Sequence, residues 1–318
     1  MPPPSFLASP IPILFGTTPP MKRSQPQRKE ELVRANVDLV KRLGPLCHGV
    51  VVYDVWEGNE RGKFRTKYGD NRPFALRLRD ETRKEVVVCN VVVHHDGLEG
   101  YGKWLDESAA QGLGTQVYVG ASTDKFPFTG PHPREALKLA ANRHPSLTKG
   151  CITIPWRFHE ARRLAKKVEL GATFALSQVV LEPVSGMKLV DELEKQCAAA
   201  DLEPPLLLWN FAPAPDLDVA LEDFDYFEVF PAPDNPEAHR AAQKNWDRIA
   251  LAKDPLRESV EVAAENLEQL LNHCLRSRVP PGITVEGLGA QNLDYVEGLF
   301  RRLCDVRAGV VKQRYGLA

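Results

Sequence analysis

Two carboxylates, Asp54 and Glu57, stand close together in the segment YDVWEGNER, directly after the apolar run 50–52. A general acid needs a carboxyl whose pKa is raised by a partly apolar site, and Trp56 beside Glu57 can supply such surroundings. We therefore expect Asp54 or Glu57 to deliver a proton in catalysis. The alternative is a solvated loop in which one of these carboxylates pairs with Arg61.

Three more polar residues are candidates for binding a ligand. Gln178, near the end of the run 173–180, can donate and accept hydrogen bonds in one plane, as the edge of a planar heterocycle requires, or it can satisfy backbone groups. Glu286 ends the run 283–286 and can contact a bound ring or ribose, or form a buried salt bridge. Lys167, on the amphipathic segment 157–170, can reach a phosphate or pair with the end of a helix dipole.

The other reactive groups in the sequence do not indicate a metal site, a hydrolase or disulfide bonds. His94 and His95 precede Asp96, but adjacent histidines on one strand point to opposite faces, so we expect no metal site. No Gly-x-Ser-x-Gly motif occurs, which argues against a hydrolase with a nucleophile elbow. The cysteines form no Cys-x-x-Cys pair, and we expect them to be reduced and buried; they are Cys47, Cys89, Cys151, Cys197, Cys274 and Cys304.

The composition excludes several classes of partner. With 41 basic and 42 acidic side chains the formal net charge is −1, so no global field attracts nucleic acid or an anionic membrane. No apolar run approaches the roughly 18–20 residues of a membrane span, and the opening MPPPSFLASPIPILF lacks the pattern of a signal peptide. We expect a cytoplasmic protein that binds small molecules.

Short β-branched runs alternate with longer amphipathic segments, as in parallel sheets with crossover helices. The strands predicted are 11–15, 50–55, 86–93, 115–119, 151–154, 173–180, 206–211 and 283–286. The helices predicted are 28–43, 98–111, 133–143, 157–170, 185–199, 234–274 with a break near Pro255, and 290–305, whereas segment 56–84 is interpreted as a long loop.

Eight strands with helices between most of them predict a closed (β/α)₈ barrel, an α/β TIM barrel of one domain over residues 1–318 with a short Pro-rich extension at 1–10. A doubly wound sheet is the alternative, but it usually has a Gly-rich phosphate turn after its first strand, and here that turn is GTTPP. In a barrel, the reactive side chains follow the carboxyl ends of the strands.

The segment GCITIPWRFHEARRLAKKVELGATFALSQVV, residues 150–180, resembles the methylenetetrahydrofolate reductase family. The shared features are a strand ending in Pro, a helix closing in Lys167, a Gly-Ala pair and a strand ending in Ser-Gln178. FGTTPP at 15–20, YVGAS at 118–122, LLLWNFAPAP at 206–215 and ITVEGLG at 283–289 are weaker similarities.

The resemblance implies roles for single residues, and it also shows departures. It implies that Gln178 holds a pterin and that Lys167 helps to hold the cofactor. The family's acidic residue on the first strand becomes Gly16. The Arg-Gly-Asp that contacts flavin and pterin in the family becomes Gly120, Ala121 and Ser122, and a histidine on its third strand becomes Asn90.

By this resemblance we expect an NAD(P)H-dependent oxidoreductase that reduces 5,10-methylenetetrahydrofolate to 5-methyltetrahydrofolate, with Asp54 or Glu57 in place of the absent acid. Ser122 and Glu286 are expected to join Gln178 in binding the folate, and Asn90, Gly120 and Ala121 to join Lys167 in binding the cofactor. The altered positions favour hydride transfer without FAD over a flavin mechanism. The alternative is a pterin- or flavin-binding barrel without reductase activity that serves in binding or methyl transfer.

Overall fold

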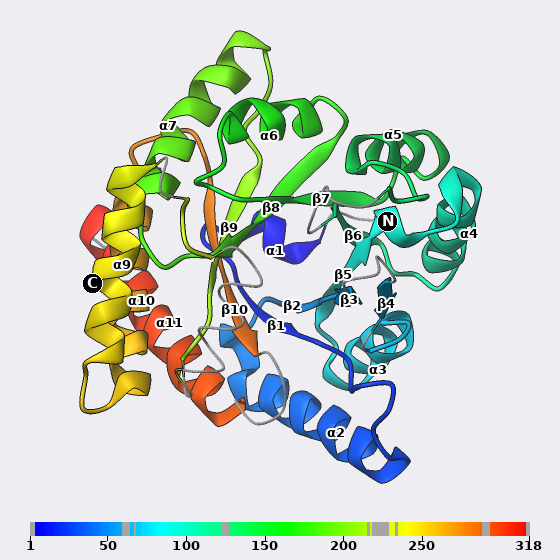
Figure 1. Ribbon diagram of the computed structural model, residues 1–318, viewed down its shortest axis with the longest axis horizontal. Coiled ribbons are helices and arrows are strands. Elements are labelled where there is room, and N and C mark those ends of the chain that lie inside the picture. The colour runs from blue at the N-terminus through cyan, green and yellow to red at the C-terminus, as the bar shows by residue number, and fades with distance from the viewer. Residues whose placement is uncertain are drawn as a thin grey trace.

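The structure, a computed structural model, describes residues 4–58, 64–66, 68–121, 127–214, 217, 229–232, 235–287 and 293–315. Its parallel strands close into a barrel in the order β1-β10-β9-β8-β7-β6-β5-β2 (Figure 1). Their bounds are β1 Ile13–Thr17, β2 Gly49–Val52, β5 Glu85–Val91, β6 Thr115–Val119, β7 Thr148–Thr153, β8 Ala172–Val179, β9 Leu206–Phe211 and β10 Pro281–Gly287. The predicted (β/α)₈ barrel is therefore confirmed.

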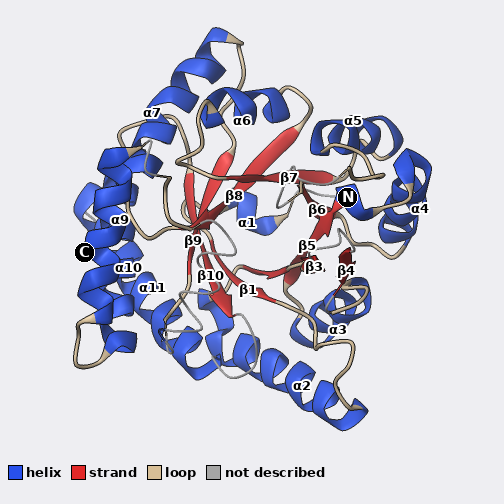
Figure 2. Ribbon diagram, viewed as in Figure 1, coloured by secondary structure: helices blue, strands red, loops and turns tan. Residues whose placement is uncertain are grey.

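Helices surround the ring of strands (Figure 2). They are α2 Pro26–Leu43, α3 Arg72–Thr82, α4 Gly97–Ala110, α5 Pro133–Arg143, α6 Glu160–Val168, α7 Val184–Ala199, α9 Pro236–Ala250, α10 Pro255–Cys274 and α11 Leu293–Tyr315, with 3₁₀ turns at Gly44–Leu46 and Val92–His94. The predicted break near Pro255 is confirmed. The Asp254 side chain accepts a hydrogen bond from the backbone N–H of Arg257, which caps α10, and Pro255 suits the first turn of that helix.

The interpretation of segment 56–84 as a long loop was wrong. It contains a small antiparallel pair, β3 Trp56–Gly58 and β4 Phe64–Thr66, followed by the full helix α3. Charged residues dominate α3 and obscure its apolar side, which consists of Phe74, Ala75 and Leu78. Those three side chains are buried in the core cluster that also contains Val86 of the neighbouring strand, so packing defines a helix that composition concealed.

Side chains alternate between the two faces of each barrel strand. Those that face the helices form the larger core, which includes Val50, Val52, Val86 and Val88. Those that face inward form a separate cluster that fills the barrel, made of Phe6, Leu14, Val51, Val87, Cys89, Val117, Phe174, Leu176, Leu206 and Leu208. The interior of the barrel, from the amino-terminal ends of the strands to their middle, is thus a packed core and not a channel.

A short N-terminal helix, α1 Ser5–Ala8, lies in the middle of the strand ring (Figure 1). Its Phe6 is fully buried and meets Phe174 edge-to-face at 5.7 Å between ring centroids. The backbone N–H of Ser5 donates to Oε1 of Glu85, the first residue of β5, at 2.7 Å. Because α1 closes the amino-terminal end of the strands, the carboxyl ends form the mouth at which a ligand can enter.

Candidate functional site at the mouth of the barrel

The interior becomes polar where β9 and β10 end. Leu208 points inward, so the two-residue period of a strand brings Asn210 to the same side. On β10 the same period leads from Gly282, which lies against Leu208, through Thr284 to Glu286. The Asn210 amide nitrogen donates to Oε1 of Glu286, and both residues are at most 9% exposed. An amide and a carboxylate therefore stand together at the mouth.

Three polar atoms in this layer are buried without a hydrogen-bond partner of ordinary geometry among the described residues. They are Oδ1 of Asn210, Oγ1 of Thr284 and the hydroxyl of Tyr53, which follows β2. Each such atom costs about 1–3 kcal/mol when it stays unpaired. A bound molecule with hydrogen-bonding atoms along one edge would remove part of that cost. We therefore identify this layer as the candidate binding site.

Gly16 on β1 creates room for Tyr53. Its Cα neighbours are Glu286 on β10 and Val51 on β2, so position 16 lies between the carboxylate and the strand that leads to Tyr53. A Cβ at Gly16 would lie 2.7 Å from both Cε2 and the hydroxyl of Tyr53. Burial first, and then the charge of Glu286, raise the pKa of Tyr53 well above its usual value. The phenol therefore keeps its proton at physiological pH.

Asp54 joins the carboxyl ends of two strands. Its Oδ2 accepts a hydrogen bond from the backbone N–H of Val91, at the end of β5, at 2.9 Å. Burial raises the pKa of Asp54 to about 6; hydrogen bonds from Val91 and Trp56 oppose this rise, and the charge of Asp70 adds to it. A carboxyl with such a pKa can exchange a proton near neutral pH. The role of Asp54 as an acid stays a prediction.

The charges of Asp54 and Glu286 both raise the pKa of the same buried thiol. Cys89 lies in the interior cluster, and burial, followed by the charges of Asp54 and then Glu286, raises its pKa well above the usual value. The two carboxylates thus lie on the same part of the barrel interior. Glu57, the other predicted acid, lies in β3 opposite Arg65, and its side chain is outside the described part of the chain.

Gln178 is half-buried at a bulge near the end of β8, where the pairing with β9 shifts between Leu176 and Val179. Its Oε1 accepts a hydrogen bond from the backbone N–H of Val179 at 3.0 Å. The hydroxyl of Ser177 donates to the Gln178 carbonyl at 2.7 Å and accepts from the backbone N–H of Asn210 at 2.9 Å. The bulge thereby ties Gln178 to the strand that carries Asn210.

Among the residues predicted to hold a cofactor, Lys167 and Asn90 have partners within the protein. The amino group of Lys167 donates to the carbonyl of Ile152 at 2.6 Å, which ties α6 to β7. The amide oxygen of Asn90 pairs with Nε2 of His95 at 3.0 Å. Gly120 and Ala121 follow β6 and present no polar side chain, and Ser122, which is predicted to bind the folate, is outside the described residues. Two of the expected polar groups are therefore already engaged within the protein.

An aromatic cluster forms part of the rim. Trp56 stacks on His94 with 4.2 Å between ring centroids, and His94 meets Phe128 edge-to-face at 5.1 Å. Burial lowers the pKa of His94 to about 4, and the charge of His95 acts in the same direction, so this cluster is neutral and mainly apolar. Within the described ranges, no three His, Cys, Asp or Glu side chains are grouped to hold a metal ion.

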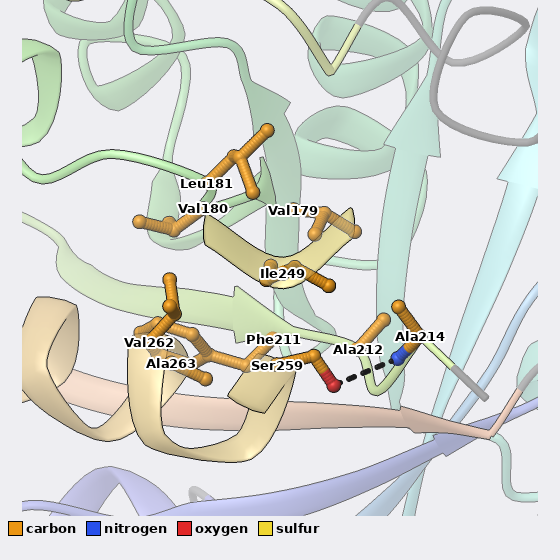
Figure 3. Close-up of a pocket in the computed structure, with 10 residues that line it drawn as sticks. All are labelled: Val179, Val180, Leu181, Phe211, Ala212, Ala214, Ile249, Ser259, Val262 and Ala263. Carbon is orange, nitrogen blue, oxygen red and sulfur yellow. Dashed lines mark hydrogen bonds between the residues drawn. The ribbon is translucent and has the colours of Figure 1, made fainter. Parts of the chain in front are cut away.

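A small cavity behind the ends of β8 and β9 is not the binding site. Its volume is about 20 Å³, and apolar side chains of β8, β9, α9 and α10 line it (Figure 3). Its polar lining group, the hydroxyl of Ser259, accepts a hydrogen bond from the backbone N–H of Ala214 at 3.1 Å. The cavity has room for about one water molecule and none for a heterocycle.

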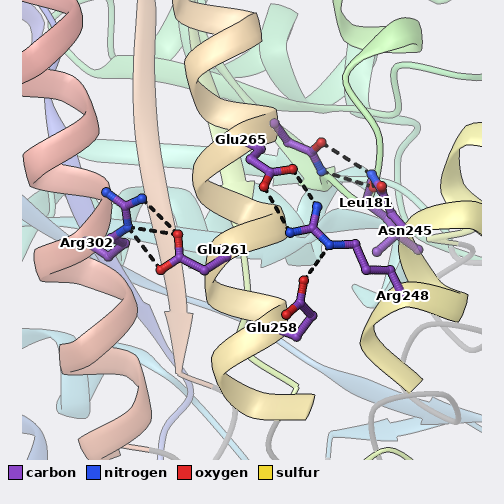
Figure 4. Close-up of polar contacts among 8 residues, drawn as sticks. Leu181, Asn245, Arg248, Glu258, Glu261, Glu265 and Arg302 are labelled. Atoms are coloured by element: carbon purple, nitrogen blue, oxygen red, sulfur yellow. Dashed lines mark hydrogen bonds and ion pairs between the residues drawn. The ribbon is translucent and has the colours of Figure 1, made fainter. Parts of the chain in front are cut away.

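The loop after β8 is held from behind. The carbonyl of Leu181 accepts hydrogen bonds from the side-chain amides of Asn245 on α9, at 2.9 Å, and Asn266 on α10, at 3.0 Å (Figure 4). Arg248 of α9 forms ion pairs with Glu258 and Glu265 of α10. These contacts fasten α9 to α10, and they fix the loop that follows Gln178.

Sequence reasoning left Tyr53, Thr284 and Asn210 without assigned roles. A signal was present for two of them: Tyr53 lies two residues after Val51, and Asn210 lies two residues after Leu208, so the strand period marks both as inward-facing. The order of the strands around the ring determines which residues of the other strands these side chains meet.

One comparison with a solved structure supports the fold. No family model and no curated protein matches the chain. Among the described residues no helix is long and apolar enough to span a membrane. One solved structure, described as apo-MsnO8, matches 94% of this chain and 98% of its own with 9% identity and a TM-score of 0.48. Another solved structure is an uncharacterized protein from Clostridium thermocellum that binds two copies of 5-methyl-5,6,7,8-tetrahydrofolic acid. It matches 93% of this chain and 96% of its own, with 16% identity and a TM-score of 0.75. The chain shares the fold of that protein.

Proposed function

We propose that this chain binds the pterin ring of a reduced folate at the barrel mouth. The observation that carries the proposal is the buried pair of Glu286 and Asn210, beside unpaired atoms of Asn210 and Thr284. A pterin presents N–H donors next to ring acceptors along one edge. A carboxylate accepts from the donors, and an amide serves either kind of atom. The solved structure from Clostridium thermocellum, which shares this fold and binds 5-methyltetrahydrofolic acid, supports the same ligand class.

We further propose that the bound folate is reduced. A reduced nicotinamide, NADH or NADPH, would supply the hydride to the one-carbon bridge of 5,10-methylenetetrahydrofolate. Opening the five-membered ring breaks the bond between the bridge carbon and N10, whose electron pair then takes a proton. Asp54, with a pKa of about 6, would deliver that proton and recover it from solvent. The mouth orients the pterin, and the buried surroundings limit access of water.

Direct hydride transfer is the mechanism that we propose over one that uses FAD. The amino group of Lys167 and the amide of Asn90 already have partners within the protein, and Gly120 and Ala121 offer no polar side chain. These observations support a protein that works without flavin. Absorbance of the freshly purified protein tests this point, since flavin bands at stoichiometric strength would require the flavin mechanism.

A binding protein without reductase activity is the second candidate. It is favoured by Gly16, which stands where the resemblance places a catalytic acid. Calorimetry with 5-methyltetrahydrofolate tests folate binding, and oxidation of NADH in the presence of 5,10-methylenetetrahydrofolate tests reduction. Binding without NADH or NADPH oxidation would establish the second candidate, and absence of both would refute the folate proposal.

Glu286→Gln tests the site itself, because it keeps the shape of the side chain but removes the charge that accepts from the pterin. We expect folate binding to weaken by roughly 10–100-fold. The matched control is Glu261→Gln, which removes a carboxylate paired with Arg302 on the outer helices (Figure 4) and should leave binding unchanged. Equal affinity in wild type and Glu286→Gln would place the ligand elsewhere.

A further inference from the structure

Tyr53 lies at the mouth of the barrel and has no role in the proposed reaction. It is the residue before Asp54, and its ring packs against the interior cluster that fills the barrel. Its hydroxyl is buried and faces the carboxylate of Glu286, but it makes no hydrogen bond of ordinary geometry to the described residues. A buried phenol normally has a partner, because its polar end gains little from an apolar site. An atom that lacks one at the mouth of a barrel is available to a ligand.

The glycine at position 16 is what allows the phenol to reach this place. Position 16 lies next to Glu286 in the sheet, and any side chain there would occupy the space of the Tyr53 hydroxyl, 2.7 Å from an ideal Cβ. The backbone N–H of Tyr53 donates to the carbonyl of Thr17 at 2.9 Å, which fixes the residue beside β1. Gly16 and Tyr53 therefore form a complementary pair: the first provides the space that the second fills.

We propose that Tyr53 is a ligand-binding residue that donates its phenolic proton to an acceptor atom of the bound ring, next to the N–H group that Glu286 accepts. The inference rests on the proposed folate binding and names the residue that adds a donor to the site. Glu286 supplies an acceptor and Tyr53 a donor on neighbouring positions around Gly16. Such a pair recognises a lactam or amidine edge, in which an N–H stands beside a carbonyl or a ring nitrogen.

The chemistry separates this role from that of a general acid. A group that gives up its proton during turnover needs a pKa near the working pH. The pKa of Tyr53 is raised well above its usual value by burial and by the charge of Glu286. The phenol therefore remains a neutral donor throughout the physiological range, and Asp54 remains the residue that exchanges a proton.

Calorimetric titration of the full chain with 5-methyltetrahydrofolate tests the proposal through Tyr53→Phe, which removes one oxygen and keeps the ring. We expect affinity to fall by about 10–100-fold, as for loss of one buried hydrogen bond. The control is Tyr118→Phe, another buried tyrosine whose hydroxyl donates to Oε1 of Gln116 at 3.3 Å in the core that faces the helices. This variant should bind within about twofold of wild type.

Gly16→Ala tests the geometry without any ligand. The added methyl group overlaps the Tyr53 ring, so the unfolding midpoint in urea should fall, and Tyr53→Ala in the same chain should restore part of the loss. A Gly16→Ala variant as stable as wild type, or no coupling between the two changes, would overturn the placement of the phenol.

The binding outcomes distinguish a failure of the role of Tyr53 from a failure of the proposed folate binding. If wild type binds 5-methyltetrahydrofolate and Tyr53→Phe binds equally well, the role of Tyr53 is refuted and the proposed function stands. If wild type does not bind this folate, the proposed function fails and the inference falls with it.

Discussion

Ionisation of Asp54 affects stability in a way that can be measured without a ligand. Burial raises its pKa from 3.8 to about 6. This rise corresponds to about 3 kcal/mol of free energy between the protonated and ionised forms. The folded protein holds this proton more tightly than the unfolded chain does. The free energy of unfolding therefore falls as pH rises from about 4 to about 6, and the full penalty persists above pH 6.

Asp54→Asn removes the charge but keeps an oxygen that can accept from the Val91 N–H. We expect the variant to exceed wild type in stability by up to about 3 kcal/mol at pH 7.5, and by much less near pH 4, where the wild-type carboxyl is protonated. Part of the gain is offset because the new amide N–H₂ group also needs partners. Urea unfolding at the two pH values, followed by tryptophan fluorescence, measures the difference.

A surface carboxylate provides the matched control. Asp106 is paired with His144 at 2.7 Å and Arg143 at 2.8 Å, and these contacts lower its pKa. Asp106→Asn should therefore give no gain at pH 7.5, the opposite of the result at Asp54. If Asp54→Asn matched wild type at both pH values, Asp54 would be ionised at no cost and the argument from burial would be wrong.

The same variant tests catalysis. If Asp54 delivers the proton to N10, Asp54→Asn should lose about 10²-fold or more in turnover while it retains folate binding, because the amide cannot act as the acid. A variant that is more stable and much slower would show that the buried carboxylate of Asp54 lowers the stability of the protein but is needed for turnover. Full turnover in Asp54→Asn would assign the proton to another group.

Two further predictions concern ligand binding and the closed end of the barrel. Gln178→Ala should weaken binding of 5-methyltetrahydrofolate by roughly 10–100-fold in a folded protein, and unchanged affinity in calorimetry would remove Gln178 from the site. Phe6→Ala should lower the free energy of unfolding by about 3–5 kcal/mol, because Phe6 is fully buried against Phe174, while ligand affinity stays the same. A small loss of stability in denaturant unfolding would show that α1 contributes little to the closed end.

The sequence alone determined the architecture, because the physical signal of a buried parallel strand is local. Runs such as VVV at 50–52 and LLLW at 206–209 are apolar on both faces and are separated by amphipathic helices, which the barrel requires. The local signal failed at α3, where only Phe74, Ala75 and Leu78 mark the buried side among charged residues. There the helix is defined by the strands on which it packs.

The composition of the site was decided by the tertiary structure. Asn210 and Glu286 are 76 residues apart and meet because β9 and β10 are neighbours in the closed ring. Tyr53 passes over Gly16 because β1 pairs with β2 on one side and with β10 on the other. Lys167, marked by the family resemblance, donates to the carbonyl of Ile152, a contact between α6 and β7 that only the folded chain creates. Closure of the barrel brings the first and last strands together, and no pattern within a single segment of the chain encodes which side chains then meet.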